Sequence, residues 1–253
     1  MPISFPNKPG LVIYITAGDP DLNTTRDIAL AAIDNGADVI ELGVPFSDPL
    51  ADGPVIQRAS ERAVARGTRL TDVLAIAKDL RAARPNCGLV LFSYLNPVIR
   101  LGMEKFCAAA AEAGADGVLL TDMIVEEAGE YLESMRAHNL APIFLAAPTS
   151  PDARLKAIAA VSQGFVYAIS RVGITGTQQQ VAGDASKLVA RLRQFTELPI
   201  AVGFGISNAE HVKSVGKFAD AAIIGSALVA LIEKTPPEQA AAAVGNFIAG
   251  LRA

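Results

Sequence analysis

Tryptophan is absent from this chain of 253 residues, and aromatic residues make up only 6% of it, so the core must be built mainly from Ala, Val, Leu and Ile. The two cysteines, Cys87 and Cys107, have no metal-binding spacing, which favours reduced packing residues of a cytoplasmic protein. No basic block accompanies the net charge of −4, which argues against nucleic acid or an anionic membrane as the main partner. No apolar run reaches the roughly 18 residues of a membrane span. The first ten residues lack the basic-then-apolar pattern of a signal peptide.

What the chain does contain is a regular alternation of apolar runs and helical patterns. Runs typical of buried strands cover residues 11–16, 39–42, 88–92, 117–120, 142–146, 165–169, 200–203 and 221–224. Helical patterns lie between them, among them 55–66, 71–84, 103–113, 125–138 and 184–195. Eight such units predict an α/β fold, a single (β/α)8 TIM barrel that occupies residues 1–253 as one domain.

A repeated tripeptide pattern supports this count of strands. Three similar tripeptides stand between a helical pattern and an apolar run: Gly36-Ala37-Asp38, Gly114-Ala115-Asp116 and Phe218-Ala219-Asp220. We expect them to introduce the second, fourth and eighth strands.

The second strand carries the strongest chemical signal, because Glu41 stands inside its apolar run. A carboxylate in such a place is unfavourable unless it is paired, neutral or used in chemistry. The alternative is a structural carboxylate bonded to backbone amides. A loop with three prolines follows at residues 44–54 and adds Asp48 and Asp52. Because loops of this kind tend to carry function, we interpret the stretch as an active-site strand and lid.

The ends of the other strands limit the mechanisms. In this type of barrel the active site lies at the carboxyl ends of the strands. All eight lysines, together with His138 and His211, fall in helical patterns, at helix ends or in the N-terminal tail, which disfavours a Schiff base or a histidine base. The ionisable residues expected at strand ends are Asp19, Glu41, Asp48, Asp52, Tyr94, Asp122, Tyr167 and Arg171. Acid–base catalysis by carboxylates is therefore favoured, and a Mg²⁺ site built from Asp19, Glu41 and Asp122 ranks below it.

Glycines follow the last three predicted strands, in Gly173-Ile174-Thr175-Gly176, Gly203-Phe204-Gly205 and Gly225-Ser226. Glycine lets backbone amides approach a ligand, and a helix N-terminus favours an anion. Each set alone could be a turn, but together they predict a phosphate site.

These motifs together resemble the tryptophan synthase alpha chain family. The stretch from Glu41 to Pro54 carries the resemblance, supported by 14–20, 170–176, 203–207 and 225–227, and the similarity covers nearly the whole chain. It implies a carbon–carbon lyase of tryptophan biosynthesis, which reversibly cleaves indole-3-glycerol phosphate to indole and glyceraldehyde 3-phosphate. It also implies no cofactor for this chain, and a beta-chain partner that holds pyridoxal phosphate, in an α2β2 heterotetramer.

The resemblance also assigns roles to residues. Glu41 is expected to be the acid–base catalyst and Asp52 the partner of the indole nitrogen. Tyr167 is expected to belong to the catalytic residues with these two, and to shape the closed site together with Thr175. The residues expected to bind phosphate are Gly176, Gly205, Gly225 and Ser226. Phe204 and Leu119 are expected to form the indole pocket. We also expect Tyr14, Phe92 and Tyr94 to bind substrate, and Thr175 to bond Asp52 when the two loops close.

Two other hypotheses remain at this point. Another phosphate-binding barrel enzyme would share the glycines without needing the stretch from Glu41 to Pro54. A non-catalytic subunit would have no reason to keep both Glu41 and Asp52. The first strand begins by Leu11, so the N-terminal helix usual in the family is largely missing, and another segment must close the bottom of the barrel or leave that end looser.

Overall fold

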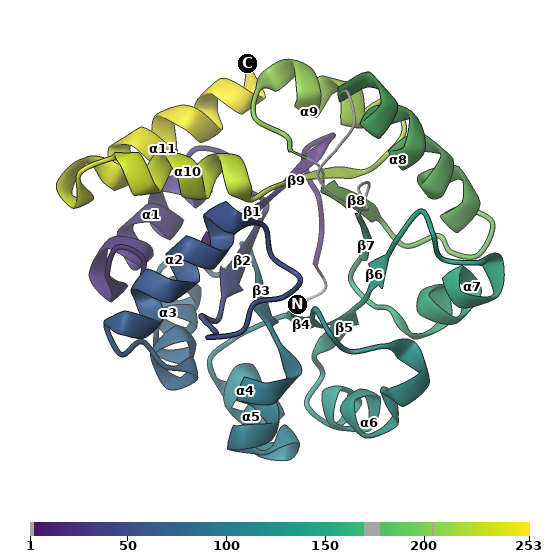
Figure 1. Ribbon diagram of the computed structural model, residues 1–253, viewed down its shortest axis with the longest axis horizontal. Helices are drawn as coiled ribbons and strands as arrows, with labels where there is room; N and C mark the ends of the chain where they lie inside the picture. Colours follow the sequence, from purple (N-terminus) through teal and green to yellow (C-terminus); the bar gives the residue numbers. More distant parts are fainter. Residues whose placement is uncertain (1–2, 170–177, 204) are drawn as a thin grey trace.

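The computed structural model describes residues 3–169, 178–203 and 205–253, and within them one parallel sheet runs around a central axis (Figure 1). Its strands are β1 (Gly10–Thr16), β2 (Val39–Gly43), β3 (Gly88–Ser93), β4 (Gly117–Leu120), β5 (Ala141–Ile143), β6 (Leu145–Ala146), β7 (Val166–Ile169), β8 (Ile200–Gly203) and β9 (Ala221–Ile224). Their order in the sheet is β5-β4-β3-β2-β1-β9-β8-β7-β6. The predicted alternation is confirmed, and so is the TIM barrel.

Helices surround the sheet on its outer side (Figure 1). They are α1 (Leu22–Asp34), α2 (Pro54–Ala65), α3 (Leu70–Ala83), α4 (Leu95–Leu101), α5 (Met103–Glu112), the 3-10 turn η1 (Val125–Glu127), α6 (Gly129–Ala137), α7 (Asp152–Val161), α8 (Gln178–Leu192), α9 (Ala209–Val215), α10 (Ser226–Lys234) and α11 (Pro237–Arg252). Among the described residues, no helix is long and apolar enough to cross a membrane.

The barrel closes at Phe144, which divides the predicted strand 142–146 into two. Ile143 in β5 pairs with Leu119 in β4, whereas Leu145 in β6 pairs with Tyr167 in β7. Phe144 contributes the bond between the two sides, because its carbonyl accepts from the Tyr167 amide at 3.1 Å. β5 and β6 together therefore fill one barrel position, and the expected eight positions are present.

Alternation along the strands sorts the side chains into an inner and an outer set. The inner set includes Val12, Val39, Val90, Leu119, Ile143, Phe165, Ala201, Ala221 and Ile223, which form one buried cluster inside the barrel. The intervening residues pack against the helices, as Ile13, Ile40, Leu91, Val118, Val202 and Ile224 do. Because side chains alternate with a period of two, Glu41 shares the inner face with Val39 and projects into the barrel.

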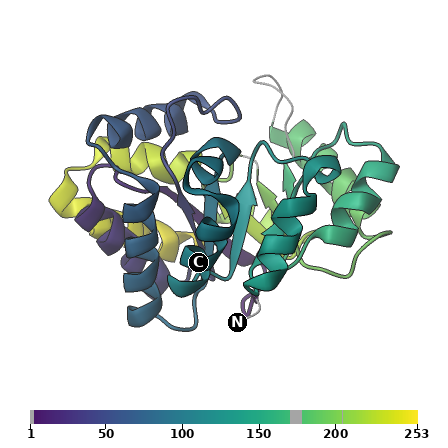
Figure 2. The ribbon, with the colours of Figure 1, turned by 90° about the horizontal axis from the view of Figure 1, so that it is seen from below.

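The N-terminal segment closes the bottom of the barrel. Ile3 is buried in the inner cluster, and Phe5 packs edge-on against Phe165 with ring centroids 5.9 Å apart. Figure 2 shows this segment at the opposite end from the loop that joins β2 to α2. The non-helical segment before β1 therefore closes the bottom of the barrel, which is the first of the two outcomes expected for that end.

The three echoed tripeptides lie at the same bottom end and introduce β2, β4 and β9, as predicted. Each aspartate accepts the backbone N–H of a residue in the preceding barrel strand, at 2.8 Å from Leu11 to Asp38, 2.9 Å from Leu89 to Asp116 and 2.7 Å from Ile200 to Asp220. Each also pairs with an arginine, which is Arg252, Arg81 and Arg193 in turn. The repeated sequence therefore reflects a repeated clasp between neighbouring strands.

Two helix predictions need correction, and one helix was not predicted. That helix, α4, begins at Leu95, and Pro97 is tolerated in its first turn because its missing N–H has no intrahelical partner there. The helix predicted for 125–138 is a 3-10 turn followed by α6 from Gly129. α8 begins at Gln178 and not at Asp184, where the helical pattern placed its start.

Candidate active site

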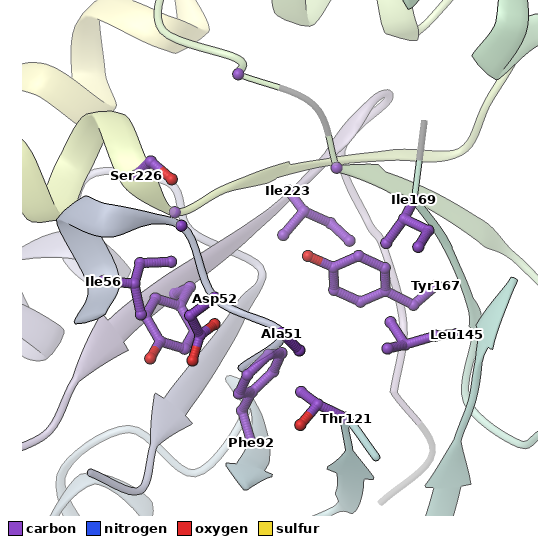
Figure 3. Close-up of a pocket in the computed structure, with 15 residues that line it drawn as sticks. Ala51, Asp52, Ile56, Phe92, Thr121, Leu145, Tyr167, Ile169, Ile223 and Ser226 are labelled. Carbon is purple, nitrogen blue, oxygen red and sulfur yellow. The ribbon is translucent and has the colours of Figure 1, made fainter. Parts of the chain in front are cut away.

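A cavity of about 350 Å³ opens at the carboxyl ends of the strands. Its wall is formed by Tyr14, Ala51, Asp52, Gly53, Ile56, Phe92, Thr121, Leu145, Tyr167, Ile169, Gly203, Gly205, Ile223, Gly225 and Ser226. Figure 3 shows apolar side chains and Tyr167 on one side, with Asp52, Ile56 and Ser226 opposite. The volume suits a small ligand, and the mixed lining suits one that has an apolar and a polar end.

Glu41 lies beneath this cavity in the middle of the barrel. Its neighbours in register are Tyr14 on β1 and Val90 on β3, and its side chain is completely buried. Neither carboxylate oxygen has a hydrogen-bond partner among the described residues. Burial raises the pKa of Glu41 to about 8, so the group holds a proton at neutral pH and can exchange it there. The alternative of a carboxylate bonded to backbone amides does not fit.

Asp52 is held by Tyr94 at the edge of the cavity. The Tyr94 hydroxyl donates to Asp52 Oδ2 at 3.0 Å and accepts the backbone N–H of Ala51 at 2.9 Å. Burial raises the pKa of Asp52 to about 6, and the bond from Tyr94 opposes this rise. Asp52 therefore remains mostly ionised at neutral pH, whereas Glu41 remains mostly protonated.

The loop that carries Asp52 is fixed at its other end by α2. The Ser60 hydroxyl accepts the Phe46 amide N–H at 2.8 Å and donates to the Phe46 carbonyl at 3.1 Å. The Phe46 ring then packs on the Tyr94 ring, with centroids 5.2 Å apart. The prolines and glycines that suggested a lid thus occur in a loop held by specific contacts.

Two tyrosines cross the cavity over glycines on the next strand. The Tyr14 hydroxyl lies where a side chain on Gly43 would collide with it, and a Cβ on Gly203 would stand 2.9 Å from the Tyr167 hydroxyl. Burial, as the first cause, and the nearby carboxyl groups raise the pKa of Tyr167 well above its ordinary value. Both hydroxyls therefore stay protonated near Glu41 and can donate hydrogen bonds.

The polar end of the cavity is formed by Gly205, Gly225 and Ser226. Ser226 is the first residue of α10, and no acidic residue occupies the first turn of this helix. Gly205 has a φ of 41°, a left-handed backbone that favours glycine. A helix N-terminus that opens into a cavity presents unpaired backbone N–H groups, which suit a phosphate.

The other predicted site residues fall in three groups. Phe92 lines the cavity and packs edge-on against Tyr14 at 5.0 Å between centroids. Leu119 is fully buried in the inner cluster below, and Tyr94 stands behind Asp52 without forming part of the wall. Thr175, Gly176 and Phe204 lie outside the described residues, and so does the predicted bond between Thr175 and Asp52.

The sequence analysis missed part of the wall. Ile56, Thr121, Leu145, Ile169 and Ile223 line the cavity but were not identified as site residues. A signal for two of them was available, because Ile169 and Ile223 stand two positions from Tyr167 and Gly225 and so share their face of the sheet.

The alternative catalytic groups lie away from the cavity. His138 accompanies Glu104 and Ser134 beside α6, and His211 is in α9. Asp19 is bound by Arg62 at 2.7 Å, and Asp122 accepts the Leu95 amide at 2.7 Å. Among the described residues, no group of three or more His, Cys, Asp or Glu side chains is arranged to hold a metal ion.

Comparison with known proteins identifies the family. The family model described as tryptophan synthase alpha chain matches residues 3–250. The tryptophan synthase alpha chain of Cupriavidus taiwanensis is 48% identical over 97% of this chain and 92% of its own length. That of Solibacter usitatus is 50% identical over 90% of this chain and 85% of its own length.

Solved structures give the same result. A chain from the tryptophan synthase α2β2 complex of Pyrococcus furiosus superposes with a TM-score of 0.91 at 39% identity, and the match covers 97% of this chain and 98% of that chain. A chain from ligand-free tryptophan synthase of Mycobacterium tuberculosis gives a TM-score of 0.87 at 35% identity, covering 97% and 94%. The chain described here therefore belongs to the tryptophan synthase alpha chain family.

Proposed function

We propose that Glu41 and Asp52 divide the acid–base work of a carbon–carbon lyase, with indole-3-glycerol phosphate as the substrate. Membership of the family makes the chain a lyase of tryptophan biosynthesis. One observation carries the proposal: the carboxyl group of Glu41 is buried below the cavity, has no hydrogen-bond partner among the described residues, and has a pKa of about 8.

The bond to be broken joins indole C3 to the side-chain carbon that carries a hydroxyl. Protonated Glu41 first gives its proton to C3, and the positive charge that develops on the ring is stabilised at the nitrogen by ionised Asp52. Glu41, now a carboxylate, then takes the hydroxyl proton. The O–H electrons form the carbonyl of glyceraldehyde 3-phosphate, and the electrons of the C–C bond return to the ring to give indole. Glu41 ends protonated, so the cycle needs no cofactor.

The two ends of the cavity suit the two ends of this substrate. The apolar wall of Phe92, Leu145 and Ile223 would take the indole ring, with Asp52 at its nitrogen. The N-terminus of α10 at Ser226 would take the phosphate. The hydroxyl to be deprotonated would lie between these ends, above Glu41.

The decisive experiment is the Glu41→Gln variant, which keeps the size of the side chain but removes the titrating group. Indole release from indole-3-glycerol phosphate should fall by about 10² to 10⁴, the usual contribution of general acid–base catalysis. Binding of glyceraldehyde 3-phosphate should remain. Near-normal turnover would exclude Glu41 as the catalyst, and lost binding of the phosphate would make its role structural.

For the partner, we propose a beta chain that docks over the loops after β2, β3 and β4, in an α2β2 assembly. Three large apolar residues are exposed there: Leu50, Ile99 and Ile124, at 92%, 60% and 43%. Because β2, β3 and β4 are neighbours in the sheet, the three residues share one rim of the barrel. Apolar groups that gather on a surface in this way mark a contact site. Asp52 lies in the first of these loops, so docking there could influence the site.

A further inference from the structure

An ion-pair network outside the cavity joins three elements that border it. Arg62 in α2 uses every nitrogen of its guanidinium group. Nε and Nη2 bind the two carboxylate oxygens of Asp19 at 2.8 and 2.7 Å, and Nη1 binds Glu233 in α10 at 2.7 Å. Arg58, one turn earlier in α2, binds both oxygens of Glu233 at 2.9 and 2.8 Å. The loop after β1, α2 and α10 are thus connected through one residue.

Two of these elements, and the strand before the third, also place a residue on the cavity wall. Ile56 belongs to α2, Ser226 to α10, and Tyr14 to β1, the strand that leads into the loop with Asp19. Figure 1 shows α2 beside α10, and Figure 3 shows Ile56 and Ser226 on the same side of the cavity. Gly225, Ile56 and Tyr14 are close neighbours, because a Cβ added to Gly225 would be in van der Waals contact with Ile56 Cδ1 at 3.8 Å and with Tyr14 Cβ at 3.6 Å.

The connection matters because the two ends of the substrate site come from different helices. Asp52, the proposed partner of the indole nitrogen, stands two residues before α2 begins at Pro54. The proposed phosphate site is the N-terminus of α10. A ligand that engages both ends gains affinity only when their separation matches its length.

We infer that Arg62 is a positioning residue that fixes α2 relative to α10, and so sets the distance between the indole end and the phosphate end of the site. This inference rests on the proposed function. Asp19 is only 3% exposed, and a carboxylate so buried is more readily explained by the geometry it imposes than by stability alone. Hydrogen bonds from Arg58 are the first cause that lowers the pKa of Glu233 to about 2, so the α10 end of the network stays ionised at working pH.

The planar guanidinium group is essential to this role. It can bind one carboxylate through two nitrogens and a second carboxylate through the third, in a fixed geometry. Lysine would keep the charge but present a single nitrogen. Arg62→Lys should therefore retain only part of the affinity that Arg62→Met loses for a ligand that engages both ends of the site.

The test compares three ligands: indole, glyceraldehyde 3-phosphate, and an unreactive analogue in which a three-carbon chain without hydroxyl groups joins indole C3 to phosphate. In Arg62→Met the linked analogue should bind about tenfold or more weakly, whereas the Kd of each separate fragment should change by less than about twofold. Arg84→Met is the matched control, because Arg84 makes a two-nitrogen pair with Asp34, at 2.7 Å for both contacts, between α3 and α1. The control should change none of the three affinities.

Glu233→Ala keeps the inference testable if Arg62→Met does not fold. It breaks the link to α10 and leaves the bonds between Arg62 and Asp19, and it should weaken the linked analogue selectively in the same way. The inference is overturned if the linked analogue binds within about twofold of the parent, or if all three ligands weaken equally. Failure of the parent chain to bind either fragment would instead overturn the proposed function.

Discussion

At the scale of single residues, the two carboxyl groups of the site differ because their surroundings differ. Glu41 is completely buried and its pKa rises to about 8, whereas Asp52 has one hydrogen bond from Tyr94 and its pKa is about 6. Between about pH 6 and about pH 8, Glu41 is therefore a proton donor while Asp52 is an ionised acceptor. This interval is where the chemistry proposed here should run fastest.

The pH profile of kcat/KM should show this interval, with an acid limb near pH 6 from Asp52 and a basic limb near pH 8 from Glu41. In Tyr94→Phe the hydrogen bond that lowers the pKa of Asp52 is lost, so the acid limb should move to higher pH while the basic limb stays. Tyr131→Phe is the control, since the Tyr131 hydroxyl donates to the Val118 carbonyl instead. An unmoved acid limb would argue against Asp52 as the group that titrates there.

The raised pKa of Glu41 also predicts how stability depends on pH. The folded chain keeps this proton up to about pH 8, whereas the unfolded chain loses it near pH 4.5. Between these values the unfolded chain binds fewer protons, so the free energy of unfolding that Glu41 contributes falls as pH rises. The free energy of unfolding of Glu41→Gln should thus rise relative to that of the parent by up to about 1.4 kcal/mol per pH unit across this window. Above the window, the difference in free energy of unfolding should level off. Urea unfolding from pH 5 to 9 measures this difference, and a difference independent of pH would contradict the burial argument.

At the scale of elements, Asp52 and Ser226 lie where helices begin, whereas Glu41 lies within strand β2. Asp52 precedes α2, and Ser226 begins α10. Ser226 was predicted from the short motif Gly225-Ser226, because a helix that starts just after a buried strand in such a barrel opens towards the active site. α4 was not predicted, although its Pro97 is compatible with the first turn of a helix.

The phosphate end can be tested without disturbing the fold by Ser226→Asp. A carboxylate at a helix N-terminus favours the helix, so the melting temperature should stay the same or rise slightly. The same charge would repel a bound phosphate, and glyceraldehyde 3-phosphate should bind at least about fivefold more weakly, from a repulsion of roughly 1 to 4 kcal/mol. Indole should bind as in the parent. Unchanged phosphate affinity by calorimetry would place the anion elsewhere.

At the scale of the whole molecule, the barrel separates stability from function. The N-terminal segment and the three clasps formed by Asp38, Asp116 and Asp220 lie at the bottom, away from the cavity. The exposed apolar rim lies at the opposite end, beside the cavity. Substitutions at the cavity end can therefore alter binding without affecting the contacts that stabilise the bottom of the barrel.

The proposed docking rim predicts a selective effect of Ile99→Glu in α4. A charge placed in an apolar contact should weaken association with a beta chain by about tenfold or more, while indole release by the isolated chain stays unchanged. Val64→Glu is the matched control, because Val64 is 39% exposed near the C-terminal end of α2 and away from the rim. Equal weakening by both variants would indicate that the rim is not the contact.

The sequence by itself determined the architecture and singled out the buried carboxyl group of Glu41. Alternating apolar runs and helical patterns specify local structure, and the period of two along a strand is enough to direct Glu41 into the barrel. The tertiary structure decided which distant residues meet. Tyr94 binds Asp52, which is 42 positions away in the sequence, and Arg62 binds Glu233, which is 171 positions away. The barrel closes at Phe144. These contacts depend on how the strands are staggered around a closed sheet and how the helices pack outside it, and no local pattern of residues encodes either.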